Sequence, residues 1–400
     1  MGLYKYYSIP SDRMGALWTL LSIRGACILE FGTAGTTRFA LNNFHKMRGA
    51  QNSQLYTTHL DENDIAMGDV SRMDKAIEDI VNEGVTKHIF LMSSTVSSVI
   101  GIDIEAYCNI YSEQYPEVKF TYISNDGFKG DWTLGVKNAL ETLVTHIPKD
   151  TNRSKNFTYN IIGACADDYN YAADCIEIDR IMKEALNGEN ICTLTSNTSI
   201  EQIEKMGAAH LNIVMRSEGE EAAKILEKNF EVPYVMGRPY GLKGTLDWIK
   251  KIEAAAKLSS NKEFIENEEK LLKEEIEKAS LALKNNSDIC LGGHYDIVKA
   301  IGDFVSNEIG LNIKNIWCSS PSFSTEAIPF YEEKLWEEVV LKGDYDILMG
   351  SGAVINIGKE DSKKLQIDLP NLVYSRGEVF EKPYVGFLGA KYLLNKLIEK

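Results

Sequence analysis

The feature that most constrains this chain is one repeated pattern, a short apolar run followed by a helical segment. The apolar runs are rich in β-branched residues and bounded by Gly, Ser, Asn or Asp, which predicts buried strands. They occupy residues 27–32, 87–94, 118–124, 157–163, 191–196, 210–215, 232–237, 288–293 and 345–352. Amphipathic segments that predict helices include residues 69–84, 176–188, 218–230 and 295–310. Strands that alternate with helices predict parallel sheets in α/β layers.

Two polar segments divide this pattern. Residues 262–285 are charged and carry Glu and Lys four positions apart, which favours an exposed helix. The loop near residues 146–156 is the other candidate boundary. We therefore predict an α/β protein with three Rossmann-like units and parallel β-sheets. The units are expected at 1–150, 151–258 and 286–400, with a charged helical connector at 259–285.

The charge balance narrows the choice of partners. The net charge is −15 and the pI is near 5.0, so the average surface repels nucleic acid and anionic membranes. No stretch approaches the roughly 18 apolar residues of a membrane helix, and the N-terminus lacks the features of a signal peptide. We expect a cytoplasmic protein with no nucleic-acid or membrane partner. The 7 cysteines form no CxxC pair, which fits buried thiols in a reducing compartment.

Nucleotide-binding motifs are incomplete. The sequence contains no GxxxxGK[ST], so we predict no ATP site in this chain, and it has no complete GxGxxG fingerprint. The segment FGTAGTTRF (31–39), with Gly32 and Gly35, follows a predicted strand. Its backbone N–H groups are placed to cradle an anion or a metal cluster. A tight strand–helix turn without a ligand is the alternative.

Longer stretches, read together, carry a family resemblance. In order and spacing they are similar to the nitrogenase component 1-type oxidoreductases, which include subunits of the molybdenum–iron protein and of dark-operative protochlorophyllide reductase. The likeness covers essentially the whole chain. It is carried by RMGALWTLLSIRGACILEFGTAGTTRF (13–39), THLDENDIAMGD (58–69), FLMSSTVSSVIGIDI (90–104), SNDGFKGDWTLGVKNAL (124–140), FTYNIIG, LNIV, GGHYDIVKAIGDFVSNEIGL, DYDILMGSG and PYVGFLGAKYLLNKL.

This resemblance implies a fold, partners and a cofactor. The family fold has three α/β units around a shallow cleft, and each subunit pairs with a related or identical one. A separate homodimeric iron protein ATPase docks on the pair and delivers electrons through a [4Fe-4S] or related iron–sulfur cluster. The missing P-loop agrees with this arrangement, because ATP hydrolysis belongs to the iron protein.

The family's cluster cysteines fall at Ser11, Thr36 and Thr95 in this chain. Iron–sulfur clusters are held by thiolates, and neutral hydroxyls are poor ligands. We therefore expect a cluster ligated mainly by a partner subunit. Two alternatives stay open: one unconventional ligand, either Ser11 or Cys27, or no cluster at all. Cys27 lies in an apolar strand, so packing in the core is its other interpretation.

Catalytic members of the family have a cofactor-binding cysteine after the Leu-Asn-x-Val strand, where this chain has Arg216. An arginine there is suited to an anionic substrate, and a surface ion pair with Glu218 or Glu220 is the alternative. His294 follows a predicted strand, at the edge where α/β folds bind ligands, although a lone histidine is more often structural. Arg216 and His294 are our candidate catalytic residues.

Taken together, these residues predict a subunit of a nitrogenase-like reductase that receives electrons from an ATP-dependent iron protein. Two alternatives stay open. One is a scaffold for maturation of a metallocofactor, and the other is a binding or regulatory relative without redox function.

Overall fold

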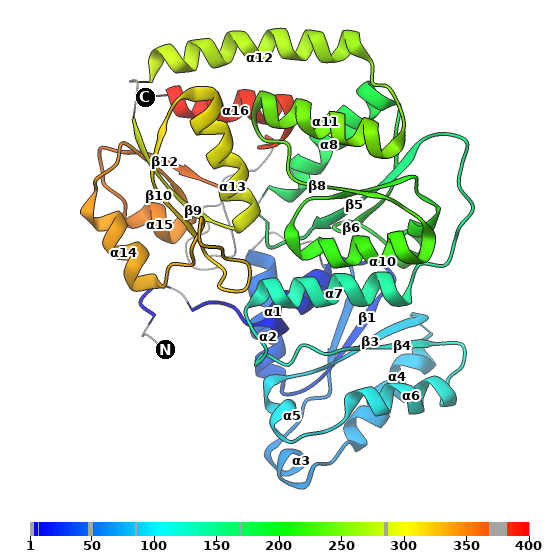
Figure 1. Cartoon of the computed structure of the whole chain (residues 1–400). Coiled ribbons are helices and arrows are strands. Elements are labelled where there is room, and N and C mark those ends of the chain that lie inside the picture. Colours follow the sequence, from blue (N-terminus) through cyan, green and yellow to red (C-terminus); the bar gives the residue numbers. More distant parts are fainter. Residues whose placement is uncertain are drawn as a thin grey trace.

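The computed structural model of the chain describes residues 4–6, 8–46, 51–84, 86–168, 170–283, 287–367 and 382–399. Its strands form three four-stranded sheets, and every strand pairing within them is parallel. Helices pack around each sheet, and the first sheet belongs to the lobe at the bottom of Figure 1. The predicted α/β class, with three units and parallel sheets, is confirmed.

The first sheet has the strand order β2-β1-β3-β4. Its strands are β1 (Cys27–Phe31), β2 (Gln54–Thr57), β3 (His88–Ser93) and β4 (Lys119–Ile123). Its helices are α1 (Asp12–Leu21), α2 (Ala34–Lys46), α3 (Glu62–Met67), α4 (Ser71–Glu83), α5 (Thr95–Val99), α6 (Ile104–Gln114) and α7 (Trp132–His146). Because Phe31 pairs with Ser93, the turns that follow β1 and β3 lie side by side.

The second sheet has the order β6-β5-β7-β8. Its strands are β5 (Thr158–Ala164), β6 (Glu189–Thr195), β7 (Leu211–Val214) and β8 (Tyr234–Met236). The accompanying helices are α8 (Tyr171–Leu186), α9 (Ile200–Glu204), η1 (Met206–Ala208), η2 (Ser217–Gly219), α10 (Glu220–Phe230) and α11 (Gly241–Ala256). The carboxyl ends of the central strands β5 and β7 are neighbours, so side chains that follow them can meet.

The third sheet has the order β10-β9-β11-β12. Its strands are β9 (Asp288–Gly293), β10 (Asn312–Cys318), β11 (Ile347–Gly350) and β12 (Lys363–Gln366). Its helices are α13 (Tyr295–Phe304), the π-helix η3 (Val305–Ile309), α14 (Glu333–Lys342) and α15 (Gly352–Ile357). The long helix α12 (Lys262–Ala282) runs across the top of Figure 1, with α16 (Gly386–Ile398) beside it.

Burial explains which strands the sequence predicts. The central strands β1, β3, β5, β7 and β11 are buried at every position, so each reads as a continuous apolar run. The sequence analysis did not predict β2, β10 and β12, all of which lie at sheet edges. β2 is half-buried throughout, and β10 alternates exposed and half-buried residues before its buried end, so neither gives an unbroken apolar signal.

The buried cores join neighbouring units. One apolar cluster packs second-unit residues such as Ile213 with third-unit residues such as Ile289 and with α12 and α16. A second cluster packs α1 and α7 against Ile162 and Val214 of the second sheet. The described strands fall inside the predicted ranges 1–150, 151–258 and 286–400, and α12 falls inside 259–285. The boundaries themselves stay a prediction, because the cores cross them.

Membrane crossing needs a long, apolar helix. Within the described ranges, no helix combines the required length with sufficient apolar content.

Candidate functional site

The first candidate site lies at the carboxyl edge of the first sheet, in the turns after β1 and β3. Gly32 directly follows β1, and a Cβ at this position would lie 2.6 Å from Ser94 Oγ in the turn after β3. A glycine is therefore required by the close approach of the two turns. Gly35, in the first turn of α2, has open space where a Cβ would be, so packing does not require a glycine there.

Two predicted ligand positions converge in this site. A Cβ built on Gly127 would lie 2.7 Å from Thr95 Oγ1 and 3.5 Å from Ser11 Oγ. Gly127 has a φ of +100°, which favours glycine as well. Both hydroxyls are half-buried, and neither makes a hydrogen bond to another residue in the described part of the chain. We call Ser11, Thr95 and Gly127 the hydroxyl site.

Thr36 lies in the first turn of α2 and faces its own backbone. Its hydroxyl donates to the Thr33 carbonyl oxygen at 2.9 Å and lies 3.3 Å from Thr33 Oγ1. The next residue, Thr37, donates to the carboxylate of Glu30, which is fully buried in β1. Arg13 of α1 forms the ion pair that neutralises this carboxylate. A closed ion pair therefore lies beneath the turns, while small hydroxyls line them.

The residues of this edge do not fit an iron–sulfur cluster as ligands. The three matching positions offer neutral hydroxyls instead of thiolates. Cys27 begins β1, whereas Gly32 follows its end, so the two lie roughly 16 Å apart along the strand. Cys27 is fully buried in an apolar cluster, and burial raises the pKa of its thiol to about 12. This geometry favours the packing interpretation for Cys27.

The second candidate site lies where the second and third sheets end. Arg216 follows β7, and its side chain crosses over Gly163 of β5. A Cβ on Gly163 would lie 2.6 Å from Arg216 Cγ, so the glycine leaves room for the arginine. The Arg216 guanidinium is buried, with a side chain only 1% exposed.

Two carboxylates neutralise this guanidinium. Asp167 accepts from Arg216 Nη1 at 2.8 Å and from Nη2 at 3.0 Å, which is a bidentate pair. Glu218 accepts from Nη2 at 2.8 Å. The indole N–H of Trp132, at the start of α7, donates to Asp167 at 3.1 Å. The first unit is thereby connected to the charges of the second.

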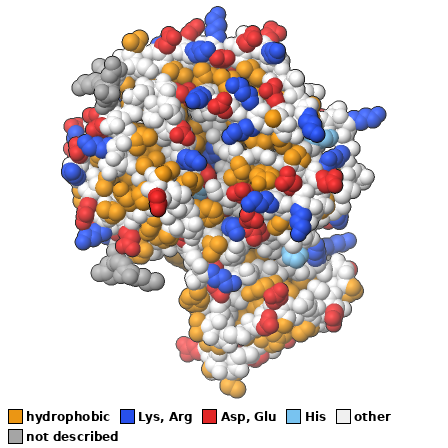
Figure 2. Space-filling view, in the orientation of Figure 1, with side chains coloured by type: hydrophobic (Ala, Val, Ile, Leu, Met, Phe, Trp, Pro, Cys, Tyr) orange, Lys and Arg blue, Asp and Glu red, His pale blue; other side chains and the backbone are white. Residues whose placement is uncertain are grey.

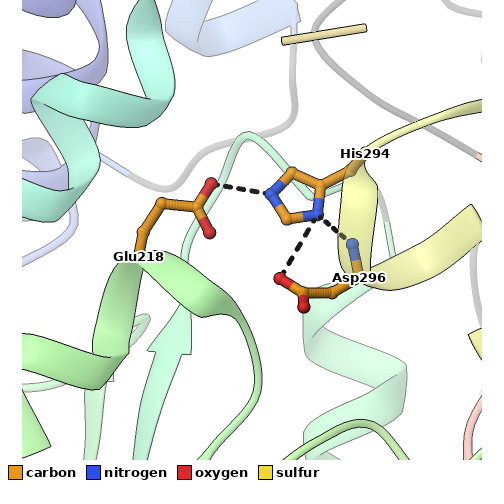
Figure 3. Close-up of side chains that lie close together, drawn as sticks. All are labelled: Glu218, His294 and Asp296. Carbon is orange, nitrogen blue, oxygen red and sulfur yellow. Dashed lines mark hydrogen bonds and ion pairs between the residues drawn. The ribbon is translucent and has the colours of Figure 1, made fainter. Parts of the chain in front are cut away.

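His294 adds the third unit to the network. It caps α13, since its Nδ1 accepts from the backbone N–H of Asp296 at 3.3 Å. This assigns the proton to Nε2, which lies 2.7 Å from Glu218 Oε1, so the ring donates to the carboxylate. Figure 3 shows the imidazole between Glu218 and Asp296. The Asp296 carboxylate in turn accepts from the backbone N–H and the hydroxyl of Ser217, at 2.6 and 2.8 Å.

We call Asp167, Arg216, Glu218, His294 and Asp296 the ionic network. Burial alone would raise the pKa of the Glu218 carboxyl, but Arg216 and His294 hold it below its ordinary value. Burial would lower the pKa of the Arg216 guanidinium, but Asp167 and Glu218 raise it well above its usual range. Each charge is therefore stabilised by its neighbours, as buried ions require.

The network contains a set of possible metal ligands, because atoms of Glu218, His294 and Asp296 lie within 4.8 Å of one another. Arg216 and the imidazole N–H engage Glu218 Oε1, and Ser217 engages Asp296, while Glu218 Oε2 has no hydrogen-bond partner among the described residues. A guanidinium 2.8 Å from Glu218 Oε1 also opposes a second cation on that oxygen. The arrangement is that of a closed salt-bridge network that joins three units.

A second buried pair lies next to this network. Arg238 forms an ion pair with Asp168, and both side chains are buried. Burial, and then the nearby Asp168 charge, raise the pKa of the Asp174 carboxyl to about 7. Asp174 accepts from the backbone N–H of Tyr384 at 2.7 Å, which connects the start of α8 to the segment before α16.

The structure brings together some of the predicted residues. Arg216 and His294 meet, with Nη2 and Nε2 3.3 Å apart, and Ser11 and Thr95 meet at Gly127. The expected ion pair of Arg216 with Glu218 is present, but it is buried rather than on the surface. The guanidinium is also covered, so an anionic substrate has no access to it. The catalytic roles of Arg216 and His294 stay a prediction.

Sequence reasoning missed Asp167, Trp132 and Asp296. The sequence does carry a signal for Asp167, because Asp167 and Asp168 follow the buried strand β5. That strand is the neighbour of β7, which Arg216 follows. Trp132 and Asp296 belong to other units and gave no signal, since only the packing of the units brings them to Arg216.

Three doubly wound sheets with candidate sites at their carboxyl edges define a class of multi-unit α/β proteins. The family of nitrogenase component 1 type oxidoreductases matches residues 11–400, and the chain belongs to that family. The resemblance seen in the sequence is confirmed.

Sequence identity to individual members of the family is low. NifE of Clostridium pasteurianum, an iron–molybdenum cofactor biosynthesis protein, is 27% identical over 74% of this chain and 67% of its own length. NifN of Nostoc sp., of the same description, is 26% identical over 63% of this chain and 60% of its own length. The vanadium–iron protein beta chain of Trichormus variabilis is 22% identical over 95% of this chain and 90% of its own.

The match to a second NifE, from Rippkaea orientalis, spans 47% of that protein, so this chain aligns with about half to two thirds of these NifE relatives. Among solved structures, the one titled "Nitrogenase Cp1 at pH 6.5" superposes with a TM-score of 0.80. It is 18% identical and the match covers 100% of this chain and 94% of the other. This likeness shows that the fold is shared.

Proposed function

We propose that this chain is the subunit of a nitrogenase-like reductase that supplies no thiolate to the iron–sulfur cluster of its assembly. The observation that carries the proposal is the replacement of the family's cluster cysteines by Ser11, Thr36 and Thr95. Two of these hydroxyls converge at Gly127 with no cysteine beside them in the described structure. A related subunit would then provide the ligands, and this chain would cover the cluster with small polar side chains.

Exposed apolar side chains around the hydroxyl site support the proposal that a partner subunit binds there. Three large apolar side chains are exposed: Phe39 by 63%, Val99 by 76% and Phe128 by 63%. Phe39 lies one helical turn after Thr36, Val99 lies one turn after Thr95, and Phe128 is next to Gly127. Exposed apolar side chains near a functional edge are typical of an interface with another subunit.

Electrons would come from an ATP-dependent iron protein, because this chain has no P-loop of its own. The chain's share in the assembly would be to bind the partner and exclude water from the shared edge. We derive no electron-transfer step through the chain itself, since its residues do not fit the cluster. Arg216, at the position of the family's cofactor cysteine, would replace a cofactor contact with the closed ionic network.

Anaerobic expression tests this proposal. The chain is purified alone and together with a related component 1-type chain, and iron is quantified alongside electron paramagnetic resonance spectra. We expect an iron-free chain alone and a cluster in the complex. A triple variant, Ser11→Ala with Thr36→Ala and Thr95→Ala, should leave the iron content of the complex unchanged. Stoichiometric iron on the isolated chain, lost in that variant, would contradict the proposal.

A second candidate is a maturation scaffold. The observation in its favour is the similarity to NifE and NifN, both described as cofactor biosynthesis proteins. A scaffold complex should release its metallocluster to an apo acceptor protein and show little reductase turnover. A reductase complex should turn over repeatedly with the iron protein and ATP, and keep its cluster. If the complex purifies without iron, both candidates fail, and a binding or regulatory role without redox chemistry is left.

A further inference from the structure

A cleft of about 990 Å³ lies at the opposite edge of the first sheet, away from the hydroxyl site. Its walls include the amino-terminal ends of β3 and β4, the end of α7 and the start of α9. The first and second units therefore both contribute to it. Figure 2 shows a histidine and basic side chains gathered in the notch between the lower lobe and the rest of the molecule.

The cleft gathers three lysines and two histidines, together with Glu117, Glu201 and Glu204, on a chain with a net charge of −15. Its basic lining residues are Lys87, His88, Lys119, His146 and Lys149. Among the described residues, only Lys149 of these five has an ion-pair partner, which is Glu204. Lys87 and Lys119 therefore bring positive charge into the cleft without a protein carboxylate in contact.

These groups lie close enough to repel one another. Lys119 is exposed, and its partial desolvation lowers the pKa of its ammonium group; the Lys149 charge lowers it further, whereas the Glu204 charge raises it. Burial, and then Lys119 and His146, lower the pKa of the His88 imidazole to about 4. His146 shows the same effect from burial and from Lys119. A cluster whose members disfavour each other's positive charge is stabilised by an anion placed among them.

The acidic residues of the lining do not fill that role. Glu204 is engaged with Lys149. Glu201 lies at the start of α9, where its own backbone N–H, followed by the Ser199 hydroxyl, lowers the pKa of its carboxyl. Glu117 is exposed and forms no ion pair with a described residue. No described carboxylate lies within ion-pair distance of Lys87 or Lys119, so both ammonium groups are open to an anion from outside the chain.

We propose that this cleft binds a small, multiply charged oxyanion between Lys87, Lys119, His146 and Lys149. Carboxylates and phosphates share the required chemistry, namely several oxygens that accept from ammonium and imidazolium groups. The cleft, at about 990 Å³, readily admits a compact di- or tricarboxylate or a short polyphosphate, and the lysines rather than its size select the ligand. This site is separate from the hydroxyl site, because it occupies the other end of the same strands. The inference therefore does not rest on the proposed function.

Isothermal titration calorimetry of the full chain with citrate and, separately, with pyrophosphate tests the proposal. Chloride at matched ionic strength is the reference for unspecific screening. We expect saturable binding of one anion per chain. Lys119→Gln should weaken it about tenfold, in line with the loss of one hydrogen bond to a charged group. His146→Asn should weaken it less at pH 8 than at pH 6, because only a protonated imidazole attracts the anion.

The matched control is Lys342→Gln, which removes an ammonium of α14 whose side chain is 75% exposed, outside the cleft. It should leave the affinity unchanged. Tighter binding of citrate assigns the site to carboxylates, and tighter binding of pyrophosphate assigns it to phosphates. The proposal is overturned if neither probe saturates at millimolar concentration, or if Lys119→Gln and Lys342→Gln have equal effects. Lys119 is exposed at the start of β4, so its replacement leaves the core intact.

Discussion

The hydroxyl site and the ionic network stand at equivalent edges of their sheets, yet they are built in opposite ways. In the hydroxyl site, Ser11 and Thr95 are neutral, half-buried and without hydrogen bonds to described residues. In the ionic network, Arg216 is buried and its charge is matched by two carboxylates. The resemblance to the family places cysteines at both. The comparison teaches that residues at the family's cysteine positions can be half-buried hydroxyls without partners at one edge and part of a buried, charge-matched junction at another.

The largest expected effect is in the ionic network. Arg216→Met keeps much of the side-chain volume but leaves Asp167 and Glu218 without their cation. Removing one partner of a buried ion pair costs about 3–5 kcal/mol. We expect this loss in the free energy of unfolding, measured by urea denaturation.

Lys250→Met is the control for this change, because its side chain is 72% exposed and a surface replacement should alter stability by less than about 0.5 kcal/mol. Equal stability of Arg216→Met and the wild type would mean that the network is not a structural junction.

The pH dependence of stability should distinguish His88 in the first sheet from Glu218 in the ionic network. The pKa of His88 is lowered to about 4 in the folded chain, against 6.5 ordinarily. The unfolded chain therefore binds the extra proton at this histidine first, and the contribution of His88 to stability falls by about 3 kcal/mol as the pH drops from 6.5 to 4. Asp174, whose pKa is raised to about 7, contributes in the opposite sense over the same range. Glu218 has a depressed pKa, so its contribution is present above pH 4.5 and is lost only at lower pH.

Urea midpoints at pH 7, 5.5 and 4 check this order of events. Compared with the wild type, His88→Gln should lose about 3 kcal/mol less stability on acidification from pH 6.5 to 4, and Glu218→Gln should follow the pH dependence of the wild type in this range. If His88→Gln has the same pH dependence as the wild type, the buried imidazole does not contribute to it.

A smaller effect is expected where the first unit meets the network. Trp132→Phe removes the indole N–H that donates to Asp167 at 3.1 Å, but retains an aromatic ring. One hydrogen bond to a charged acceptor is worth about 1.5–3 kcal/mol, and Arg216 still satisfies the carboxylate, so we expect a loss near the lower end. Denaturation in the Arg216→Met background provides the control: there the same replacement should cost more, because Asp167 then depends on Trp132 alone.

The smallest effect is expected in the hydroxyl site. Thr95→Ala removes a hydroxyl without a hydrogen bond to a described residue, so stability should change by less than about 0.5 kcal/mol. The adjacent Ser94→Ala is a matched control, because Ser94 caps α5 by accepting from the backbone N–H of Ser97 at 3.1 Å. Losing such a cap costs about 1 kcal/mol. A larger loss for Thr95→Ala than for Ser94→Ala would show that the hydroxyl site is structural, like the ionic network.

The same contrast explains what the sequence can predict. Central strands such as β1 and β5 are buried on both faces, and their apolar runs identify them directly. Edge strands such as β2 lack that run and were missed. The sequence points to Arg216 through the family's cofactor-cysteine position and to His294 through its place after a predicted strand. Their contact was not predictable, since it depends on how the second and third sheets pack. Lys119 and His146 lie at the other strand ends, where no motif marks them, so only the structure joins them in one cleft.

The space above Gly163 has a consequence for how this chain can change over time. Any side chain at residue 163 would collide with the long side chain of Arg216, and the φ of +93° disfavours such a residue as well. A bulkier residue at 163 would push Arg216 away from its two carboxylates. Conversely, a cysteine at 216 would leave a void and two buried carboxylates to be neutralised. The two positions therefore constrain each other, because arginine at 216 needs glycine at 163.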